Sequence, residues 1–268
     1  MEPEIRTCML TQNSCYQKNR RITPRGIMIH STGANNPTLK RYLAPDDGLI
    51  GQNRYNNHWN TPGLSVCVHG FIGQDQNGDV RIYQTLPWDM RGWHCGGTGN
   101  DTHISFEICE DDLTDRAYFE KTRDAALELC VYLCRTFGLD PQEPGVLVDH
   151  REGHELGIAS GHGDVHHWWS RFGYSMNDFR REAALRLRQE TTLTREAVQR
   201  MIDESMERAK PKVYKTTEAV PAWAKETVQG LMERGVLLGR ETGDLDLTED
   251  MLRLLVLWDR QEKISKAV

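Results

Sequence analysis

Residues 25–32 read RGIMIHST, a short apolar run that lies between Pro24 and Gly33. A short apolar run with turn-forming residues on both sides is typical of a buried β-strand. Similar runs follow at 103–109 (HISFEIC) and 146–150 (VLVDH). The sequence therefore predicts a sheet with several buried strands, and it places a histidine near the end of the first strand.

Two more strands and a long helix complete the predicted sheet domain. The segments 65–74 and 80–86 are joined by a turn that contains Asn77 and Gly78, a pair that favours a tight antiparallel hairpin. Residues 116–137 carry apolar side chains at three- to four-residue spacing and end before a glycine, as expected of an amphipathic helix. We therefore predict an α/β fold, a mixed central β-sheet flanked by helices.

The character of the sequence changes after this domain. A second amphipathic helix is predicted at 175–188, and residues 190–212 are rich in charged side chains, as in a solvent-exposed helix and linker. Two short amphipathic segments follow on either side of a glycine-containing turn. We expect three parts, which are a sheet domain at 1–189, a charged helical linker at 190–212 and a small helical module at 213–268.

The composition excludes several classes of protein. The chain has 268 residues, of which 38% are hydrophobic, and its net charge is −6. This is enough apolar material for a core, and too little positive charge for general nucleic-acid binding. No apolar run approaches the ~20 residues that span a bilayer, and the first residues lack the pattern of a secretory signal. We therefore expect synthesis in the cytoplasm without a signal peptide or membrane insertion, with the seven cysteines as free thiols.

Histidines gather at places where ligands of a metal ion could meet. His30 closes the first predicted strand and His150 closes another, while the loop at 157–169 (GIASGHGDVHHWW) adds His162 and Asp164. Two imidazoles and one carboxylate suit Zn²⁺ with a fourth position open for water. The residues alone leave open whether these histidines bind a metal or are only polar residues at the edge of a sheet.

Four segments in sequential order make a resemblance specific. They are IMIHSTG (27–33), LPWDMRGWHCGG (86–97), GNDTHISFEICED (99–111) and HREGHELGIASGHGDVHHWW (150–169). Together they resemble the zinc-dependent N-acetylmuramoyl-L-alanine amidases of the amidase-2 type, the superfamily of phage endolysins and peptidoglycan recognition proteins. The likeness runs from about Asn19 to Arg181, and it implies the mixed sheet of that superfamily.

The resemblance implies a Zn²⁺ cofactor held by His30, His150 and Asp164. In this chain the loop between His150 and Asp164 is longer than in the compact members of the family, so His162 remains the alternative third ligand. A Zn²⁺ ion in such a set would lower the pKa of its water from ~15.7 towards ~7.

The resemblance also implies catalytic roles for Glu107 and His162. Glu107 falls on the family's catalytic glutamate, which would act as general base and then as general acid. His162 stands where many members carry a lysine, and we expect it to stabilise the oxyanion that forms during amide hydrolysis. His94 and Trp93 are expected to line the substrate groove.

The implied activity is hydrolysis of the amide bond between N-acetylmuramic acid and L-alanine in peptidoglycan. A phage or prophage endolysin, released to the cell wall by a holin or by lysis, is the role this implies. The alternatives are a non-catalytic peptidoglycan-binding module and a zinc peptidase that cleaves wall peptides. The complete ligand set disfavours the first, and the absence of an HExxH motif disfavours the second.

The C-terminal module resembles an S-layer-homology repeat, although more weakly. The residues that carry this likeness are Trp223, Gly235, Gly239, Gly243 and Arg253. We expect its core to contain Trp223, Leu231, Leu252 and Leu255. Cell-wall binding, homo-oligomerisation and simple packing on the sheet domain are the alternatives for its role, and wall binding is slightly favoured.

Overall fold

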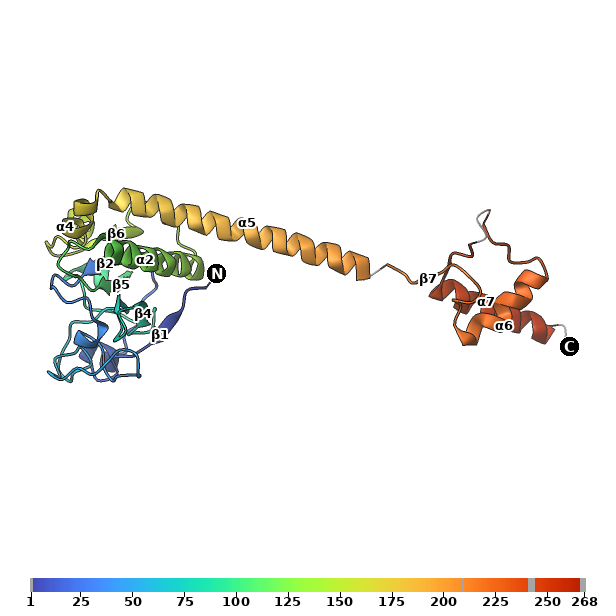
Figure 1. The fold of residues 1–268 in the computed structure, drawn as a ribbon, viewed down its shortest axis with the longest axis horizontal. Helices are drawn as coiled ribbons and strands as arrows, with labels where there is room; N and C mark the ends of the chain where they lie inside the picture. The colour runs from blue at the N-terminus through green and yellow to red at the C-terminus, as the bar shows by residue number, and fades with distance from the viewer. Residues whose placement is uncertain (1, 209, 241–243, 266–268) are drawn as a thin grey trace. The chain divides into compact units, whose positions relative to one another are not determined.

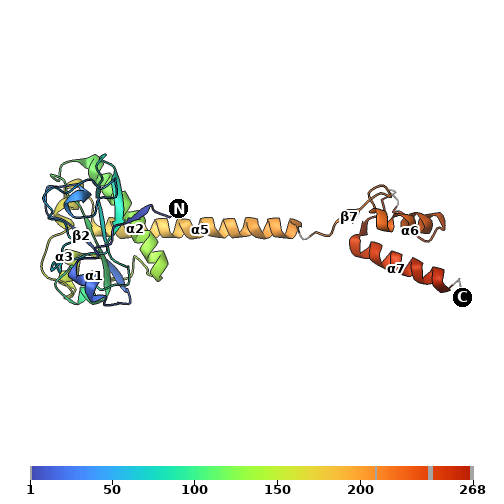
Figure 2. The ribbon, with the colours of Figure 1, turned by 90° about the horizontal axis from the view of Figure 1, so that it is seen from below.

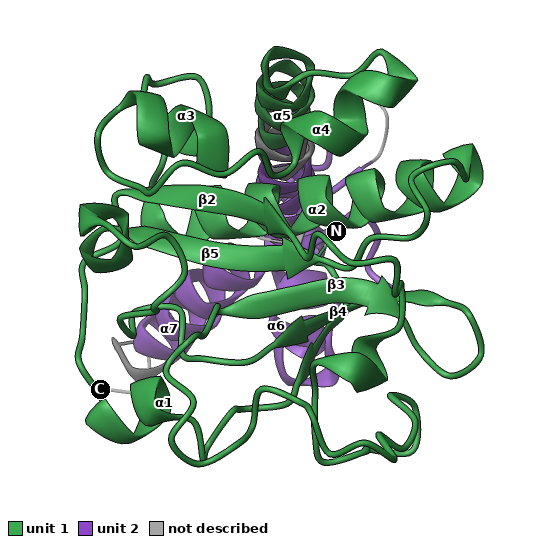
Figure 3. Cartoon of the chain, turned by 90° about the vertical axis from the view of Figure 1, so that its left-hand side faces the viewer, with its two compact units in different colours: residues 1–193 green, residues 194–268 purple. Residues whose placement is uncertain are grey.

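The computed structural model describes residues 2–208, 210–240 and 244–265. The chain forms two compact units, Met1–Leu193 and Thr194–Val268, which Figure 3 draws in different colours. Each unit has a hydrophobic core of its own. No helix in the described residues is long and apolar enough to cross a membrane.

Unit 1 is built on a six-stranded mixed sheet with the strand order β1-β4-β3-β5-β2-β6. In chain order the strands are β1 (Ile5–Thr7), β2 (Gly26–Ser31), β3 (Gly70–Gln74), β4 (Val80–Gln84), β5 (His103–Ile108) and β6 (Leu147–Asp149). Neighbouring strands are parallel except for the β3–β4 pair, which is antiparallel. Figure 3 shows β2, β5, β3 and β4 side by side. The predicted mixed sheet flanked by helices is therefore confirmed.

The β3–β4 hairpin turns at Gly78, whose φ of 85° is a conformation that glycine adopts easily. The strand predicted at 65–74 begins only at Gly70, because Cys67 instead forms an isolated bridge with Trp93. Strand β1 was not predicted, since its three residues are too few to show a periodic pattern.

Helix α2 (Arg116–Phe137) covers one face of the sheet and shares a buried core with β2 and β5. The Asp115 side chain caps its first turn by accepting hydrogen bonds from the N–H groups of Ala117 and Tyr118. Ile27 and Ile29 of β2 belong to the core beneath this helix. Because side chains alternate along a strand, His30 points to the opposite face.

The opposite face is covered by short elements and by the long connection between β2 and β3. The short elements on this face are α1 (Ser14–Lys18), η1 (Leu39–Arg41), η2 (Thr98–Asp101) and α3 (His150–Glu155), whereas α4 (His166–Trp169) and η3 (Ser170–Phe172) pack into the core beneath α2. Leu39 and Tyr42 pack in a second core with Phe71 of β3. The face of the sheet to which His30 points therefore has a hydrophobic core of its own.

A disulfide joins Cys15 of α1 to Cys67. The prediction of free thiols is therefore wrong for this pair, while the other five cysteines are free and buried. The two residues are 52 positions apart in the chain, so local sequence patterns gave no sign that they would meet. Only the packing of α1 against the segment before β3 brings them together.

Reduction of this disulfide should destabilise the protein. The disulfide closes a loop of 52 residues and so lowers the conformational entropy of the unfolded chain. In the chain-entropy model this stabilises the folded protein by up to about 4 kcal/mol, and measured values are often smaller. We expect the free energy of unfolding in urea to fall by about 2–4 kcal/mol with reductant or in Cys15→Ser/Cys67→Ser. The double variant is its own control, because reductant should not change its stability. Equal stability of the wild type with and without reductant would contradict the expectation.

Helix α5 (Met176–Arg208) is one continuous helix, which joins the helix predicted at 175–188 to the helical part of the charged linker predicted at 190–212. The two run together because residues 189–208 contain neither glycine nor proline and are rich in helix-forming side chains. The first proline after the start of this helix is Pro211. The division of the chain into its two compact units falls within α5, between Leu193 and Thr194.

Beyond α5, unit 2 contains two packed helices and a two-stranded sheet (Figures 1 and 2). Its elements are β7 (Val213–Tyr214), α6 (Ala222–Glu233), β8 (Leu247–Thr248) and α7 (Glu249–Ser265). As predicted, Leu231 and Leu252 are buried in its core, and Leu255 packs against them. Gly243, which contributed to the S-layer-homology likeness, lies outside the described residues.

The prediction that Trp223 belongs to this core is wrong, because its side chain is 46% exposed. Helix α6 buries Ala224, Val228 and Leu231 instead. These three residues follow the spacing of one helix face, and Trp223 lies about 100° away from Ala224 around the helix. The tryptophan therefore lies on the surface of unit 2.

Candidate metal centre

Three polar side chains stand at the carboxyl ends of neighbouring parallel strands. His30 is the fifth residue of β2, and its register partner on β5 is Glu107. His150 follows β6 directly and is the first residue of α3. Parallel strands end at the same edge of a sheet, where α/β proteins commonly place their ligands. The fold therefore brings these residues together although they are far apart in the sequence.

Asp164 joins the two histidines from the loop before α4. Its Oδ2 atom lies 3.3 Å from His30 Nδ1 and 3.2 Å from His150 Nδ1. The two Nδ1 atoms are themselves 3.0 Å apart. All three ligand atoms thus point at one another, as they do around a shared cation.

The donor set fits a metal ion better than it fits a hydrogen-bonded cluster. Protons on the two ring nitrogens would oppose each other at 3.0 Å, and a single shared proton could not satisfy both contacts to the carboxylate. Two imidazoles and one carboxylate are a typical catalytic Zn²⁺ set. Within the described residues, His30, His150 and Asp164 are the one group of this kind.

The charge states also suit metal binding. Burial lowers the pKa of His30, although the hydrogen bond with Asp164 acts in the opposite direction. Burial alone would raise the pKa of Asp164, but the hydrogen bonds from His150 and His30 outweigh it and hold the pKa below its usual range. His30 therefore favours the neutral form that binds metals, and Asp164 the ionised one.

The remaining ring nitrogens of both histidines have polar neighbours. His30 Nε2 lies 2.9 Å from Nδ1 of His94, and His150 Nε2 lies 3.4 Å from the Ser160 hydroxyl. Such outer contacts fix the orientation of a metal-binding imidazole. His94 was predicted to line the groove, and the structure places it against His30. Ser160 was not predicted, because nothing in the sequence distinguishes it from other loop serines.

A network of hydrogen bonds, in which Asp149 is buried and Glu152 and Arg180 are half-buried, holds His150 at the start of α3. The Asp149 side chain accepts a hydrogen bond from the Glu152 N–H group, 2.7 Å away, and Glu152 completes a capping box. Arg180 of α5 donates to both carboxylate oxygens of Glu152, at 2.8 and 2.9 Å, and to the Leu147 carbonyl. Bidentate pairs of this kind are geometrically specific. Arg180 was not predicted, since only the tertiary fold brings α5 to this place.

Glu107 has the properties of a carboxyl group that exchanges protons. Its Oε2 atom is buried and has no hydrogen-bond partner among the described residues. Burial raises the pKa of Glu107 well above its usual value, and the charges of Asp164 and Glu110 add to the effect. A carboxyl group whose pKa is raised by its surroundings is suited to exchange protons with a reacting group.

His162 and Trp93 are more exposed than the metal-binding group. The His162 ring centroid lies 4.6 Å from that of His150, and its Nδ1 atom is 3.2 Å from the Ser160 hydroxyl. Its side chain therefore stands at the solvent side of the cluster. The Trp93 side chain is 46% exposed and lies beneath the guanidinium group of Arg91. Both residues are open to a substrate from outside.

His69, which is fully buried near His94, should make stability depend on pH. Its Nδ1 accepts a hydrogen bond from the Ser105 N–H group, and its Nε2 lies 2.6 Å from the Met90 carbonyl. Burial lowers the pKa of His69 to about 4, whereas the pKa in the unfolded chain is about 6.5. The unfolded chain therefore binds a proton between these values that the folded protein does not bind, and stability falls as the pH falls.

We expect the titration of His69 to lower the free energy of unfolding by about 2 kcal/mol when the pH falls from 7 to 5. Urea unfolding at both pH values measures the loss, and His69→Gln serves as the comparison because glutamine does not titrate. The variant should lose correspondingly less stability over this range. An equal loss in both proteins would contradict the assignment.

Comparison with known proteins agrees with this geometry. Residues 19–170 match the family model described as N-acetylmuramoyl-L-alanine amidase. The fold is similar to that of the hydrolase AmiA from Staphylococcus aureus, with a TM-score of 0.52 and 21% sequence identity over 72% of this chain and 87% of that chain. A mutant endolysin from Bacillus subtilis matches with a TM-score of 0.46 and 21% identity, over 68% of this chain and 99% of that chain.

Proposed function

Because this chain belongs to the family of N-acetylmuramoyl-L-alanine amidases, we propose that His30, His150 and Asp164 hold the Zn²⁺ ion of a peptidoglycan amidase. The reaction is hydrolysis of the amide bond between N-acetylmuramic acid and L-alanine. The observation that carries the metal assignment is the convergence of two Nδ1 atoms and one carboxylate oxygen, each within 3.3 Å of the others.

A Zn²⁺ ion at these ligands supplies a Lewis acid that makes water a nucleophile at neutral pH. His94 and Ser160 orient the two histidines through their outer nitrogens. The network of Asp149, Glu152 and Arg180 keeps His150 in place at the start of α3.

Glu107 moves the protons in this proposal. Its buried carboxylate accepts a proton from the attacking water, and the same carboxyl group then donates a proton to the departing amine of alanine. The raised pKa suits the second step in particular, because a carboxyl group whose pKa lies above its usual value holds a proton more readily and can then donate it. Without the second transfer, the amine would be a poor leaving group.

His162 is proposed to stabilise the negative charge that develops on the amide oxygen. Its exposed ring stands beside His150 at the open side of the cluster. A hydrogen-bond donor at that position lowers the energy of a tetrahedral oxyanion. Trp93 is proposed to form part of the wall of the groove through its exposed ring.

Digestion of purified cell walls tests the reaction. The zinc-loaded protein should release new N-terminal alanine without new reducing sugars. New reducing ends would instead identify a glycosidase, and new amino termini other than alanine would identify a peptidase. Tight wall binding without any product would identify a non-catalytic binding module.

Wall binding by the C-terminal module is proposed as an aid to this activity, with homo-oligomerisation as the alternative. Unit 2 has its own core and an exposed Trp223, features compatible with a surface that contacts another molecule. The role of a phage or prophage endolysin that is released to the wall by a holin or by lysis is proposed on the sequence resemblance.

A further inference from the structure

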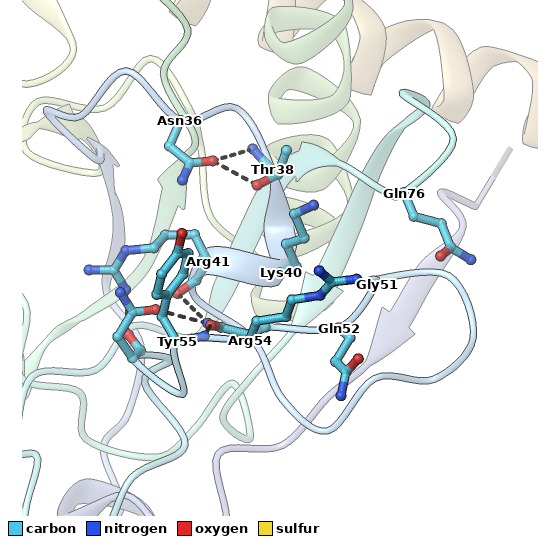
Figure 4. A pocket seen from close by; sticks show the side chains of 11 residues that line it. Asn36, Thr38, Lys40, Arg41, Gly51, Gln52, Arg54, Tyr55 and Gln76 are labelled. Atoms are coloured by element: carbon cyan, nitrogen blue, oxygen red, sulfur yellow. Dashed lines mark hydrogen bonds between the residues drawn. The ribbon is translucent and has the colours of Figure 1, made fainter.

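A cavity that is lined by polar and basic residues lies beside η1. Its volume is about 440 Å³, and its basic lining residues are Lys40, Arg41 and Arg54. The other lining side chains are neutral, chiefly the amides of asparagine and glutamine, and no carboxylate lines the cavity. Figure 4 shows these side chains around the cavity. We call it the basic pocket.

None of the three cations in the basic pocket has a counter-ion among the described residues. The side chains of Lys40 and Arg54 are exposed and form no ion pair or hydrogen bond with another described residue. Arg41 donates a hydrogen bond to the Asn57 carbonyl, which is uncharged. The chain as a whole has a net charge of −6, whereas these three cations without a neighbouring carboxylate make the pocket locally positive. An anionic group entering the pocket would meet no competing acid.

The two acidic residues of the connection between β2 and β3, Asp46 and Asp47, have other hydrogen-bond partners. Asp46 Oδ1 accepts hydrogen bonds from the N–H groups of Gly48 and Gly51. Asp47 accepts hydrogen bonds from the hydroxyl of Tyr83 and from two backbone N–H groups. Both carboxylates therefore shape the loop that forms the wall of the pocket, and neither neutralises its cations.

The basic pocket lies on the same face of the sheet as Glu107. The Arg41 guanidinium stands 5.3 Å above the ring of Tyr42, which stacks on Phe71 with centroids 5.2 Å apart. Phe71 is the register partner of Glu107 on the neighbouring strand. One pair of stacked rings thus connects the rim of the pocket to the strand that carries the proposed proton carrier.

This position suits the peptide part of the substrate. Two stacking contacts and one strand spacing of about 5 Å put Arg41 on the order of 15 Å from Glu107. An extended peptide covers about 3.3 Å per residue, so a peptide of about four or five residues that begins at the scissile amide would reach the pocket. A guanidinium group and an ammonium group are the side chains that bind a carboxylate most strongly.

We infer that the basic pocket binds a carboxylate of the substrate's peptide, several residues beyond the scissile amide, through Lys40, Arg41 and Arg54. This inference rests on the proposed function, because the peptide is placed by the amide that Glu107 helps to cleave. The neutral amides around the cations are suited to the backbone of the same peptide. The pocket would select wall peptides that keep a free carboxylate at this distance.

The test compares three N-acetylmuramoyl peptides with the full-length, zinc-loaded protein. One carries its free carboxylates, the second is amidated at the C-terminus, and the third is amidated at an acidic side chain. The wild type should cleave at least one amidated peptide about tenfold less efficiently in kcat/KM, mainly through KM. The double variant Lys40→Gln/Arg54→Gln should lose this preference and cleave all three peptides alike.

The matched control is Arg116→Gln/Lys121→Gln, which removes the same charge from α2 on the other face of the sheet. It should keep the wild-type preference. Equal cleavage of all peptides by the wild type, or an unchanged preference in the Lys40/Arg54 variant, would overturn the inference. The inference would also be overturned if the Lys40/Arg54 variant kept the peptide preference and lost only its binding to phosphate-carrying wall polymers.

A binding measurement separates this inference from the proposed function. Calorimetry with the free acidic peptide and with its amides needs no turnover, so it reports on the pocket even if no amide bond is cleaved. Weaker binding of an amide by the wild type but not by the Lys40/Arg54 variant supports the pocket. Equal binding of all forms by both proteins refutes it.

Discussion

Glu107→Gln should abolish turnover and leave the metal content unchanged. Glutamine has nearly the same shape as glutamate but cannot accept the proton of the attacking water. Since general acid–base catalysis contributes about 100- to 10,000-fold, we expect kcat to fall by that factor. The metal should remain, because Glu107 is not one of the three converging ligands. Wall digestion measures the activity, and elemental analysis measures the zinc.

The matched control for this variant is Glu110→Gln. Glu110 is buried three residues further along the chain, but its Oε1 atom pairs with His167 Nε2 at 3.1 Å. This substitution should leave kcat within a few-fold of the wild-type value. Full activity of Glu107→Gln would refute the assignment of Glu107, and an equal loss in both variants would indicate damage to the end of β5 instead.

Asp164→Ala should lose the metal, whereas His162→Ala should keep it. Asp164 Oδ2 lies within 3.3 Å of both ligand nitrogens, while His162 is exposed and its Nδ1 lies beside the Ser160 hydroxyl. Loss of outer partners alone weakens metal binding about 10- to 100-fold. We therefore expect the loss of a direct ligand to weaken it by more than about 100-fold. Competition with a chelator of known affinity measures both variants.

His162→Ala is also the control for this experiment, because it alters the same loop. It should retain one zinc per chain. It should lose activity, because the proposed hydrogen-bond donor to the oxyanion is missing. If Asp164→Ala kept stoichiometric zinc while His162→Ala lost it, the third ligand would be His162. Thermal melts of the metal-free variants show whether either substitution disturbs the fold itself.

Much of unit 1 could be predicted because its signals are local. The strands that contain His30 and Glu107 are apolar runs bounded by turn residues, and α2 shows the spacing of an amphipathic helix before Gly138. These patterns depend on neighbours within a few residues, so the sequence displays them directly. The charged residues after 189 were predicted as a helical linker, and only the structure shows that this helix continues the one at 175–188 without a break.

Some residues of the candidate site could likewise be predicted from the sequence, and others could not. His30, His150, Asp164 and Glu107 could be named from motifs, because each stands in a distinctive segment. Ser160 and Arg180 could not, since a loop serine and a helical arginine carry no signal until their partners are known. The choice between Asp164 and His162 also needed coordinates, because the two residues are separated by a single glycine in one loop.

The sequence by itself determined the type of fold, and it named the candidate residues for a zinc site and the candidate carboxyl group for proton transfer. Tertiary structure alone decided which donor atoms converge, that Cys15 meets Cys67, and that Lys40, Arg41 and Arg54 surround one pocket on the face that carries Glu107. The physical reason is the range of the interactions. Secondary structure follows from side chains a few positions apart, whereas a site depends on atoms that only the packing of distant segments brings within a few ångströms.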